Sequence, residues 1–442
     1  MGGAVSGQVI QRPERPLRGV FGSDPPIDPN RTRQDLILNL STLGGYDDNP
    51  SPTESGGTDA FTPREPGYTG YADASLRYRR VHQTQSFEVN GHGYGNAYRN
   101  LGLTPTYGGE LQARVAAPLG RSNQFDFSAA GQSAPYYTIG AFAPLRSDVA
   151  PETLPDASPA YGFSIRRSLT GTGAVSLTTR WARRHTLTET YRYQIQDFVD
   201  GIGDGHQHEG SVAYSLSLGR RSSLTSTVRH SKAEYADELT IRPMQQDAAE
   251  FGYRHEHQLR QGKRWSFALG GGTTYVQTAK SGGDGRLDYA TPSGYGNLRF
   301  DFARTWSIRG DYRRGVSVLE GLTAESFVTD TALIGVGGYI GPRTELALST
   351  GYSDGAASVA TESRSSFDSY TATIQLRFLL TRWWSAVISN NVYRYQLHGF
   401  DTLPPGLRSQ LDRNAVRVGM TFDLPLYGSY VADRRPPSPR GN

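Results

Sequence analysis

Apolar and polar residues alternate along most of this chain, most clearly in the run YTATIQLRFLL that begins at Tyr370. Its even positions carry apolar or aromatic side chains, such as Ile374 and Phe378, and its odd positions up to Arg377 carry polar ones, such as Gln375. A period of two residues is typical of a β-strand with one apolar and one polar face.

The chain then reverses through Thr381 and Arg382, carries Trp383 and Trp384 just after the turn, and continues as an extended run that includes two tyrosines. We therefore expect a hairpin with an aromatic collar at both ends, the second collar formed by Tyr393 and Tyr395. In a transmembrane β-barrel the apolar face meets lipid and aromatic rings lie at both membrane interfaces. The hairpin thus predicts a membrane barrel.

Hairpins of this kind recur along the chain. Tight turns are expected near residues 81–83, 119–122, 182–185, 219–222, 260–264, 303–306, 340–344 and 380–382. They alternate with longer connections, so the pattern predicts an all-β, antiparallel, up-and-down transmembrane barrel of about 18 strands, with 16 as the alternative. Each strand should span about 10 to 14 residues, near the length that a tilted strand needs to cross a bilayer.

Composition agrees with this fold class. Only 36% of the 442 residues are hydrophobic and 52 are glycine, which suits a wide barrel with a polar interior and a thin apolar outer band. No run of about 18 apolar residues offers a transmembrane helix. Cysteine is absent, as suits a chain that crosses an oxidising compartment.

The barrel is predicted to span residues 33–428 as one domain. Residues 1–32 are rich in Pro, Gly, Arg and Asp without a sustained period, and they are expected to form a disordered lead-in, as residues 429–442 form a disordered tail. The segment MGGAVSGQVIQRPERPLRG has no apolar core of the length that a secretion leader needs. We therefore expect the leader to have been removed or to lie upstream.

The polar faces of the strands carry many charges. If the apolar faces contact lipid, the opposite faces line a lumen. The predicted lumen-lining residues are Arg77, Arg79, Arg114, Arg192, Arg229, Arg254, Arg299, Arg309, Arg313, Arg377, Arg417, Asp73, Glu110, Asp126, Asp301, Asp311 and Asp423. Two interpretations remain open: these charges select polar solutes, or they pair around the ring and keep the wall rigid.

Tryptophans lie only beside the tight turns. The predicted aromatic girdle consists of Trp181, Trp265, Trp306, Trp383 and Trp384. Several tyrosines fall toward the longer connections, namely Tyr46, Tyr235, Tyr275, Tyr352 and Tyr395. With short turns on the periplasmic side, both chain ends of the barrel are expected there as well.

Candidate catalytic and metal sites are weak. His206, His208 and Glu209 lie close in sequence, but no third histidine stands at ligand spacing. The nearby Asp197, Asp200 and Asp204 lack the spacing and closing Glu of an EF-hand.

The sequence likewise contains no GxSxG elbow, and GGG at 270–272 lies within a strand, where glycine more often marks close packing or a bend than a phosphate-binding loop. No metal, cofactor or catalytic residue is therefore predicted. The net charge of +4 comes from arginines spread through every segment, whereas nucleic-acid binding normally shows a clustered basic face.

The first strand closing in GGYDDN, the arginine-bearing hairpins and the final strand VRVGMTFDLPLYG resemble the β-barrel porins found with bacterial exopolysaccharide export systems. The resemblance implies an outer-membrane channel that translocates a secreted polysaccharide and works with a periplasmic polysaccharide-export protein.

The alternatives are a general diffusion porin for small polar solutes and a barrel-embedded hydrolase acting on lipid or polysaccharide. In either channel, the stretch 137–160 is the predicted constriction.

Overall fold

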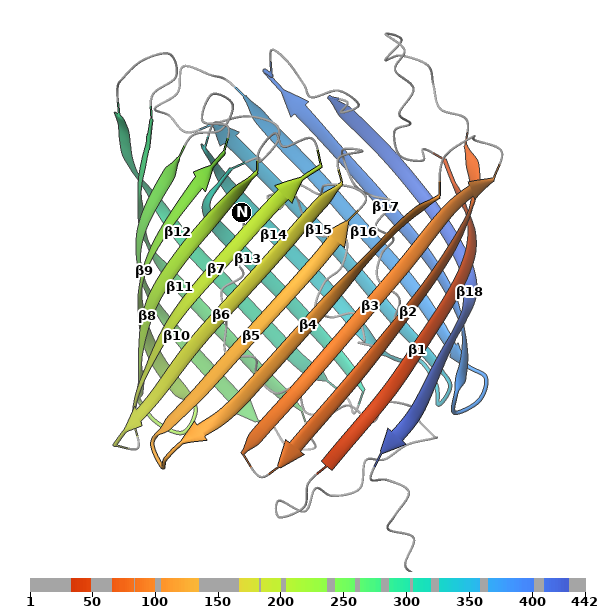
Figure 1. Cartoon of the computed structure of the whole chain (residues 1–442), viewed down its shortest axis with the longest axis horizontal. Helices are drawn as coiled ribbons and strands as arrows, with labels where there is room; N and C mark the ends of the chain where they lie inside the picture. Colours follow the sequence, from red (N-terminus) through yellow and green to blue (C-terminus); the bar gives the residue numbers. More distant parts are fainter. Residues whose placement is uncertain are drawn as a thin grey trace, which may run out of the picture.

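The computed structural model shows a closed, all-β barrel of antiparallel strands (Figure 1). It describes residues 33–48, 66–82, 84–99, 105–134, 167–182, 184–199, 204–236, 243–258, 263–279, 286–302, 305–318, 326–357, 365–400 and 409–428. The 18 strands are β1 (Arg33–Asp47), β2 (Gly67–His82), β3 (Gln85–Arg99), β4 (Thr106–Leu119), β5 (Asn123–Ala134), β6 (Ser168–Trp181), β7 (His185–Phe198), β8 (Gly205–Ser217), β9 (Ser222–Tyr235), β10 (Met244–Gln258), β11 (Arg264–Ala279), β12 (Arg286–Phe302), β13 (Trp306–Val318), β14 (Ser326–Tyr339), β15 (Thr344–Ala357), β16 (Ser366–Leu379), β17 (Trp384–His398) and β18 (Gln410–Gly428).

Each strand pairs with its neighbours in sequence, and β1 closes the ring by pairing with both β2 and β18. The predicted 18-strand up-and-down barrel is therefore confirmed, and the alternative of 16 strands is wrong. The connection from β1 to β2 is one of the longer ones, and Asp35 lies opposite Gly428 of β18 and Arg79 of β2. Both ends of the barrel chain thus lie at the end of the tight turns.

The strands are longer than the sequence suggested. They span 12 to 19 residues, whereas the prediction was about 10 to 14. A tilted strand needs about 9–11 residues to cross the hydrocarbon layer. The additional residues therefore extend the strand ladder beyond the apolar band. Because their side chains do not alternate between apolar and polar, the sequence pattern does not reveal them.

The closing pair β1–β18 contains one irregularity. Leu36 lies opposite Tyr427, but Ile37 lies opposite Pro425, so Leu426 is skipped. Proline has no N–H to donate to the ladder, and a bulge is one of the places in a sheet that tolerate it.

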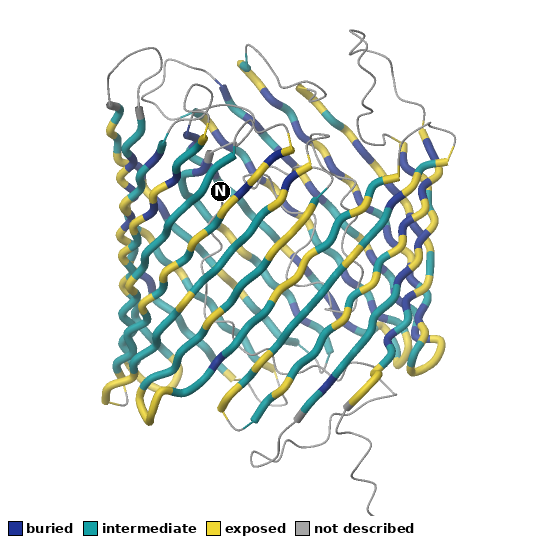
Figure 2. Tube along the Cα trace, viewed as in Figure 1, coloured by how far each residue is buried: buried dark blue, intermediate teal, exposed yellow. Residues whose placement is uncertain are grey.

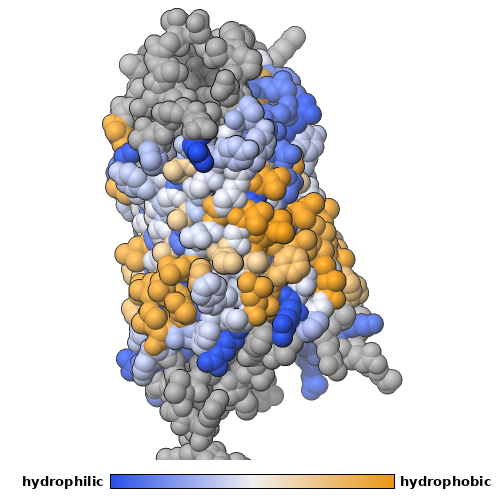
Figure 3. Space-filling model, turned by 90° about the vertical axis from the view of Figure 1, so that its right-hand side faces the viewer, coloured by the Kyte–Doolittle hydropathy of each residue, from blue (hydrophilic) through white to orange (hydrophobic). Residues whose placement is uncertain are grey.

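The two faces of the wall differ in the expected way. On β18, Val416 and Val418 are 43% and 54% exposed, whereas Arg417 between them is 2% exposed. Ile374 on β16 is exposed and Arg377 is buried. Figure 2 shows this alternation along the strands, and Figure 3 shows apolar residues gathered across the middle of the face in view. On these two strands the apolar residues named here therefore face outward and the arginines face inward.

Among the described residues, no helix is long and apolar enough to cross a membrane. Three predictions, the disordered segments 1–32 and 429–442 and the constriction at 137–160, concern residues that lie outside the described part of the chain.

Candidate functional site

The inner wall of the barrel is the candidate functional site. Because Arg377 and Arg417 are inward and buried, the strand register fixes which residues of every other strand share their face. Followed around the ring, it places these predicted residues on the inward face: Arg77, Arg79, Arg114, Arg192, Arg229, Arg254, Arg299, Arg309, Arg313, Arg377, Arg417, Asp73, Glu110, Asp126, Asp301, Asp311 and Asp423.

Many of these charges form ion pairs along the wall. The guanidinium of Arg114 on β4 lies 3.4 Å from the carboxylate of Asp126 on β5. Arg299 contacts Asp301 on the same strand at 3.0 Å, and the imidazole of the inward His92 lies 3.1 Å from Asp73. Each partner of an ion pair restricts the position of the other, so the wall carries both signs of charge in fixed positions.

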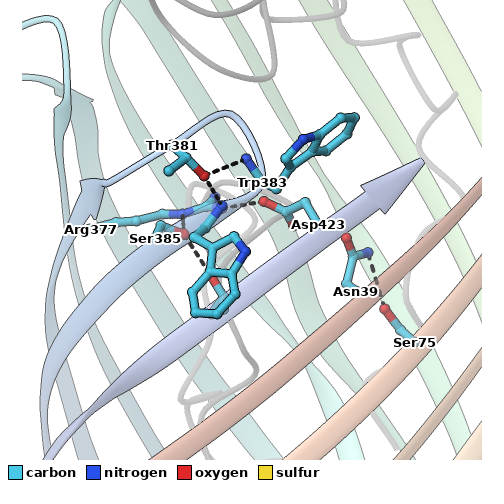
Figure 4. Close-up of polar contacts among 9 residues, drawn as sticks. Asn39, Ser75, Arg377, Thr381, Trp383, Ser385 and Asp423 are labelled. Atoms are coloured by element: carbon cyan, nitrogen blue, oxygen red, sulfur yellow. Dashed lines mark hydrogen bonds and ion pairs between the residues drawn. The ribbon is translucent and has the colours of Figure 1, made fainter. Parts of the chain in front are cut away.

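One pair spans three strands. The Arg377 guanidinium on β16 donates to Asp423 on β18 at 2.6 Å, past the intervening β17 (Figure 4). It also donates through Nε to the hydroxyl of Ser385 on β17 at 2.8 Å, and Ser385 contacts the hydroxyl of Thr421. The Arg377 and Asp423 side chains are 2% and 8% exposed, so this network is almost fully withdrawn from water.

The sequence analysis missed a second buried pair. Arg413 on β18 contacts both carboxylate oxygens of Asp47 at the end of β1, with Nε–O distances of 3.0 and 3.1 Å. Its Nη2 donates to the same carboxylate and also to the hydroxyl of Tyr98 on β3, the latter at 2.9 Å. Asp47 stands in GGYDDN, which resembles a loop sequence. Arg413 precedes the run VRVGMTFDLPLYG, which was recognised as the final strand. The parity that marks Arg417 would have assigned Arg413 to the same face.

A further charged cluster lies where β8, β9, β10 and β13 face the interior. Arg229 lies 3.7 Å from Glu250. The charge of Arg313 is opposed by that of Arg229 and favoured by those of Glu250 and Glu209. Three strands lie between β9 and β13 along the wall, and these charges come together because their side chains face the same interior. The cluster is therefore mixed in sign, with two guanidinium groups that repel each other.

Beside this cluster, Tyr295 of β12 covers two glycines. A Cβ atom at Gly252 would lie 2.2 Å from the Tyr295 hydroxyl, and one at Gly270 would lie 2.3 Å from its ring. At Gly272 an added Cβ would lie 1.9 Å from the carbonyl oxygen of Ala249. The GGG segment thus lies within a strand and allows close packing against both neighbouring strands, in agreement with the sequence analysis.

Exposure of the inward side chains varies around the ring. On β4, Gln112 is exposed and the Arg114 side chain is 42% exposed. On β16 and β18 the inward arginines are 2% exposed. Water therefore reaches the interior side of β4, while the inner face of β16 to β18 is closely packed.

The predicted girdle residues gather at the tight-turn end. Trp181 stacks on His185 with ring centroids 6.1 Å apart, and Trp265 stacks on Phe267 at 5.4 Å. Trp306 donates from its indole N–H to the carbonyl of Tyr339 at 2.9 Å. Trp384 begins β17 and meets Phe422 edge-on, whereas Trp383 lies in the turn, with the Arg382 guanidinium 4.4 Å from its ring centroid.

The predicted collar at the opposite end of the β16–β17 hairpin is wrong. Tyr393 and Tyr395 are 2% exposed and face inward, and Tyr235 also lies on an inward position of β9. The outward residues of β17 are the even ones, from Trp384 to Val392, so the parity of the strand already places the odd-numbered tyrosines inside. Outward rings at this level come instead from Tyr352 and Tyr370, whose centroids are 4.7 Å apart.

The histidine cluster does not converge. His206 and His208 face outward, because their parity opposes that of Glu209, which shares the inward face with Arg192. His206 contacts Glu234 at 3.1 Å, and His208 contacts the Tyr191 hydroxyl at 2.6 Å. Within the described residues, no group of three potential ligands is placed to hold a metal. Of the nearby aspartates, Asp200 lies outside that part of the chain.

One serine and one histidine do meet. The Ser222 hydroxyl lies 2.8 Å from Nδ1 of His255 on the outer face. Within the described residues, the contacts of this imidazole are with hydroxyls and aromatic rings rather than with a carboxylate or amide. A catalytic triad needs such a third group to orient the base.

Comparison with solved structures finds matches that cover most of this chain. The chain is similar to Pseudomonas aeruginosa OccK2 (OpdF), with 11% identity over 89% of this chain and 98% of that chain and a TM-score of 0.45. It is also similar to Acinetobacter baumannii OccAB3, with 12% identity, 88% and 99% coverage and a TM-score of 0.44. OccK2 has also been solved in complex with glucuronate. No family model matches the sequence, and no curated protein does.

Proposed function

We propose that this barrel is an outer-membrane channel through which small polar solutes diffuse. The observation that supports the proposal is the sorting of side chains on the wall: exposed apolar residues such as Val418 and Leu111 face outward, while arginines and carboxylates face inward. An exposed apolar outer surface requires lipid around it, and a closed sheet leaves no unpaired backbone edge in that lipid.

An 18-strand ring is wide enough to enclose an aqueous passage. The exposed inward side chains of β4 mark a part of the interior that water reaches. Paired charges along the wall provide hydrogen-bond donors and acceptors for polar solutes without a large net field. The mechanism is passive: solutes exchange water contacts for contacts with fixed guanidinium and carboxylate groups.

Export of a secreted polysaccharide is the narrower role that the family resemblance implies. The solved structures similar to this chain are outer-membrane porins, and nothing in them relates the chain to exopolysaccharide export. We therefore favour the diffusion channel. Outer-membrane lipid is then the surrounding partner. A periplasmic export protein remains a partner of the polysaccharide hypothesis only.

The experiment is reconstitution of the purified chain in planar bilayers and in liposomes. A diffusion channel gives stepwise ion conductance, and its liposomes swell in small sugars or amino acids. Absence of both, with the barrel folded, would contradict the proposal. Block of the conductance by a secreted polysaccharide, together with loss of that polymer on gene deletion and unchanged uptake of small solutes, would favour export. A hydrolase would instead release product from lipid or polysaccharide, and Ser222→Ala would abolish the release.

A further inference from the structure

Five polar or aromatic side chains on the outer face of the barrel, at the tight-turn end, form two hydrogen-bonded sets that are joined by stacking of two imidazoles. We call Arg221, Ser222, Tyr253, His255 and His257 the outer donor cluster. Ser222 begins β9 and lies opposite His255 of β10, and His257 lies opposite Trp265 of β11. The cluster therefore lies at the level of the tryptophan girdle, where the headgroups of a surrounding bilayer would lie.

The contacts of the two imidazoles are compatible with a proton on Nε2 of each ring. Arg221 can only donate, and its guanidinium lies 2.9 Å from Nδ1 of His257, so Nδ1 is the acceptor and Nε2 carries the proton. The Tyr253 hydroxyl donates to Ser222 at 3.1 Å. The Ser222 hydroxyl hydrogen is then free to donate to Nδ1 of His255 at 2.8 Å. Both rings thus present an N–H from Nε2.

Aromatic packing holds these donors in place. The imidazoles of His255 and His257 stack with centroids 6.3 Å apart and planes 13° from parallel. His255 also packs on Trp265 at 5.4 Å, and Trp265 stacks on Phe267. The donors are therefore preorganised by rigid rings, which reduces the ordering cost of binding a ligand.

Three outward histidines at the opposite end of the barrel contact carboxylates, and a fourth, His208, contacts the Tyr191 hydroxyl. His230 contacts Asp247 at 2.7 Å, His206 contacts Glu234 at 3.1 Å and His398 contacts Asp368 at 3.3 Å. In the outer donor cluster the partners are a guanidinium and a hydroxyl instead. Among the described residues, the neighbouring outward positions of β8 to β12 at this end carry apolar or aromatic side chains and no carboxylate. The cluster therefore combines one full positive charge with unengaged N–H groups and no negative charge.

We propose that the outer donor cluster binds the phosphate of a glycerophospholipid in the leaflet at the tight-turn end. A phosphodiester offers the anionic oxygens that a guanidinium and two imidazole N–H groups complement. The acyl chains would run along the outward apolar residues of β9 and β10, such as Val228 and Phe251, which are 59% and 57% exposed. This inference rests on the proposed placement of the barrel in a membrane.

The test is native mass spectrometry of the detergent-solubilised full chain with phosphatidylglycerol, or with a diacylglycerol of the same acyl chains. The wild type should retain the phospholipid and not the diacylglycerol. Because charge-assisted hydrogen bonds are lost, Arg221→Gln combined with His257→Gln should weaken phospholipid retention by about tenfold or more. The matched control is His230→Gln, which changes an outward histidine at the other end and should retain lipid like the wild type.

Equal retention by the wild type and the double variant would overturn the proposal, as would equal loss in the His230 variant. Displacement of the lipid by a moderate excess of inorganic phosphate would also overturn it, because the site would then bind free anions. Should the double variant fail to fold, the single Arg221→Gln change in the turn carries the same test. The cluster lies outside the lumen, so conductance of the variants should equal that of the wild type. A wild type that retains lipid but conducts no ions would refute the channel alone.

Discussion

Arg413 on β18 and Asp47 on β1 form a buried ion pair across the seam at which the last strand meets the first. Their side chains are 1% and 0% exposed, and Tyr98 of β3 accepts a further hydrogen bond from the same guanidinium. The pair thus connects three strands that lie far apart in the sequence. Every other neighbouring strand pair is joined by a turn or loop, so this seam alone depends on side chains and ladder hydrogen bonds.

Removing one partner of the seam pair should destabilise the folded barrel. Arg413→Met leaves the Asp47 carboxylate buried without its cation, and the free energy of unfolding should fall by about 3 kcal/mol. Denaturant titration of the barrel in lipid vesicles measures this change. The control is Arg394→Met on β17, because the Arg394–Asp412 pair is 49% and 59% exposed and its loss should cost less than about 1 kcal/mol. Equal effects of the two changes would show that the seam pair is not buried.

Glu189 is a charged residue on the lipid-facing side of β7. It lies opposite Leu177 of β6 and Val212 of β8, both on the outward face. A carboxyl group on that face is unfavourable in lipid. Glu189→Leu should therefore raise the free energy of unfolding by about 1 kcal/mol in the same titration. Glu250→Leu, which removes the inward partner of Arg229, should lower it. A loss of stability in the Glu189 variant would indicate that this side chain faces a polar partner rather than lipid.

The cluster around Arg313 should influence which ions pass. Two unit charges about 8 Å apart interact by about 0.5 kcal/mol in water, which is about a twofold effect on an ion's local concentration. Arg229→Gln combined with Arg313→Gln removes two positive charges from the wall, so the permeability ratio of K⁺ to Cl⁻ should rise by about twofold or more. The zero-current potential across a KCl gradient measures this ratio. Arg314→Gln provides the control on the next residue of β13, because Arg314 faces outward and pairs with Asp330 at 2.7 Å. A shift with Arg314→Gln but none with the double variant would contradict the assigned faces.

Local alternation was sufficient to predict the hairpins. The turn expected at 119–122 falls between Leu119 and Asn123, and the one at 340–344 falls between Tyr339 and Thr344. Both are marked by short polar or glycine-containing segments between runs of period two. The ends of the strands were harder to predict from the sequence. Ladder hydrogen bonds continue into segments such as GGYDD, in which apolar and polar side chains do not alternate.

Pairing of charges could not be predicted from the sequence. Arg377 reaches Asp423, which lies two strands further along the wall, because the guanidinium passes the small Ser385 on β17. Reach of this kind depends on register and on the size of the intervening side chain. The inward positions of Tyr393 and Tyr395 were, by contrast, available from the parity of β17, and the expectation of an aromatic collar overrode it.

Two adjacent residues of β4 test the central claim most directly, which is that the apolar face of the wall meets lipid and the charged face meets water. Leu111 is 61% exposed on the outward side, and Gln112 is exposed on the inward side. The chain contains no cysteine, so Leu111→Cys and Gln112→Cys each introduce a single reactive thiol. In reconstituted vesicles a membrane-impermeant maleimide should label position 112 and not 111, and a lipid-soluble maleimide should label 111. Labelling of position 111 by the water-soluble reagent, with position 112 protected, would contradict the account.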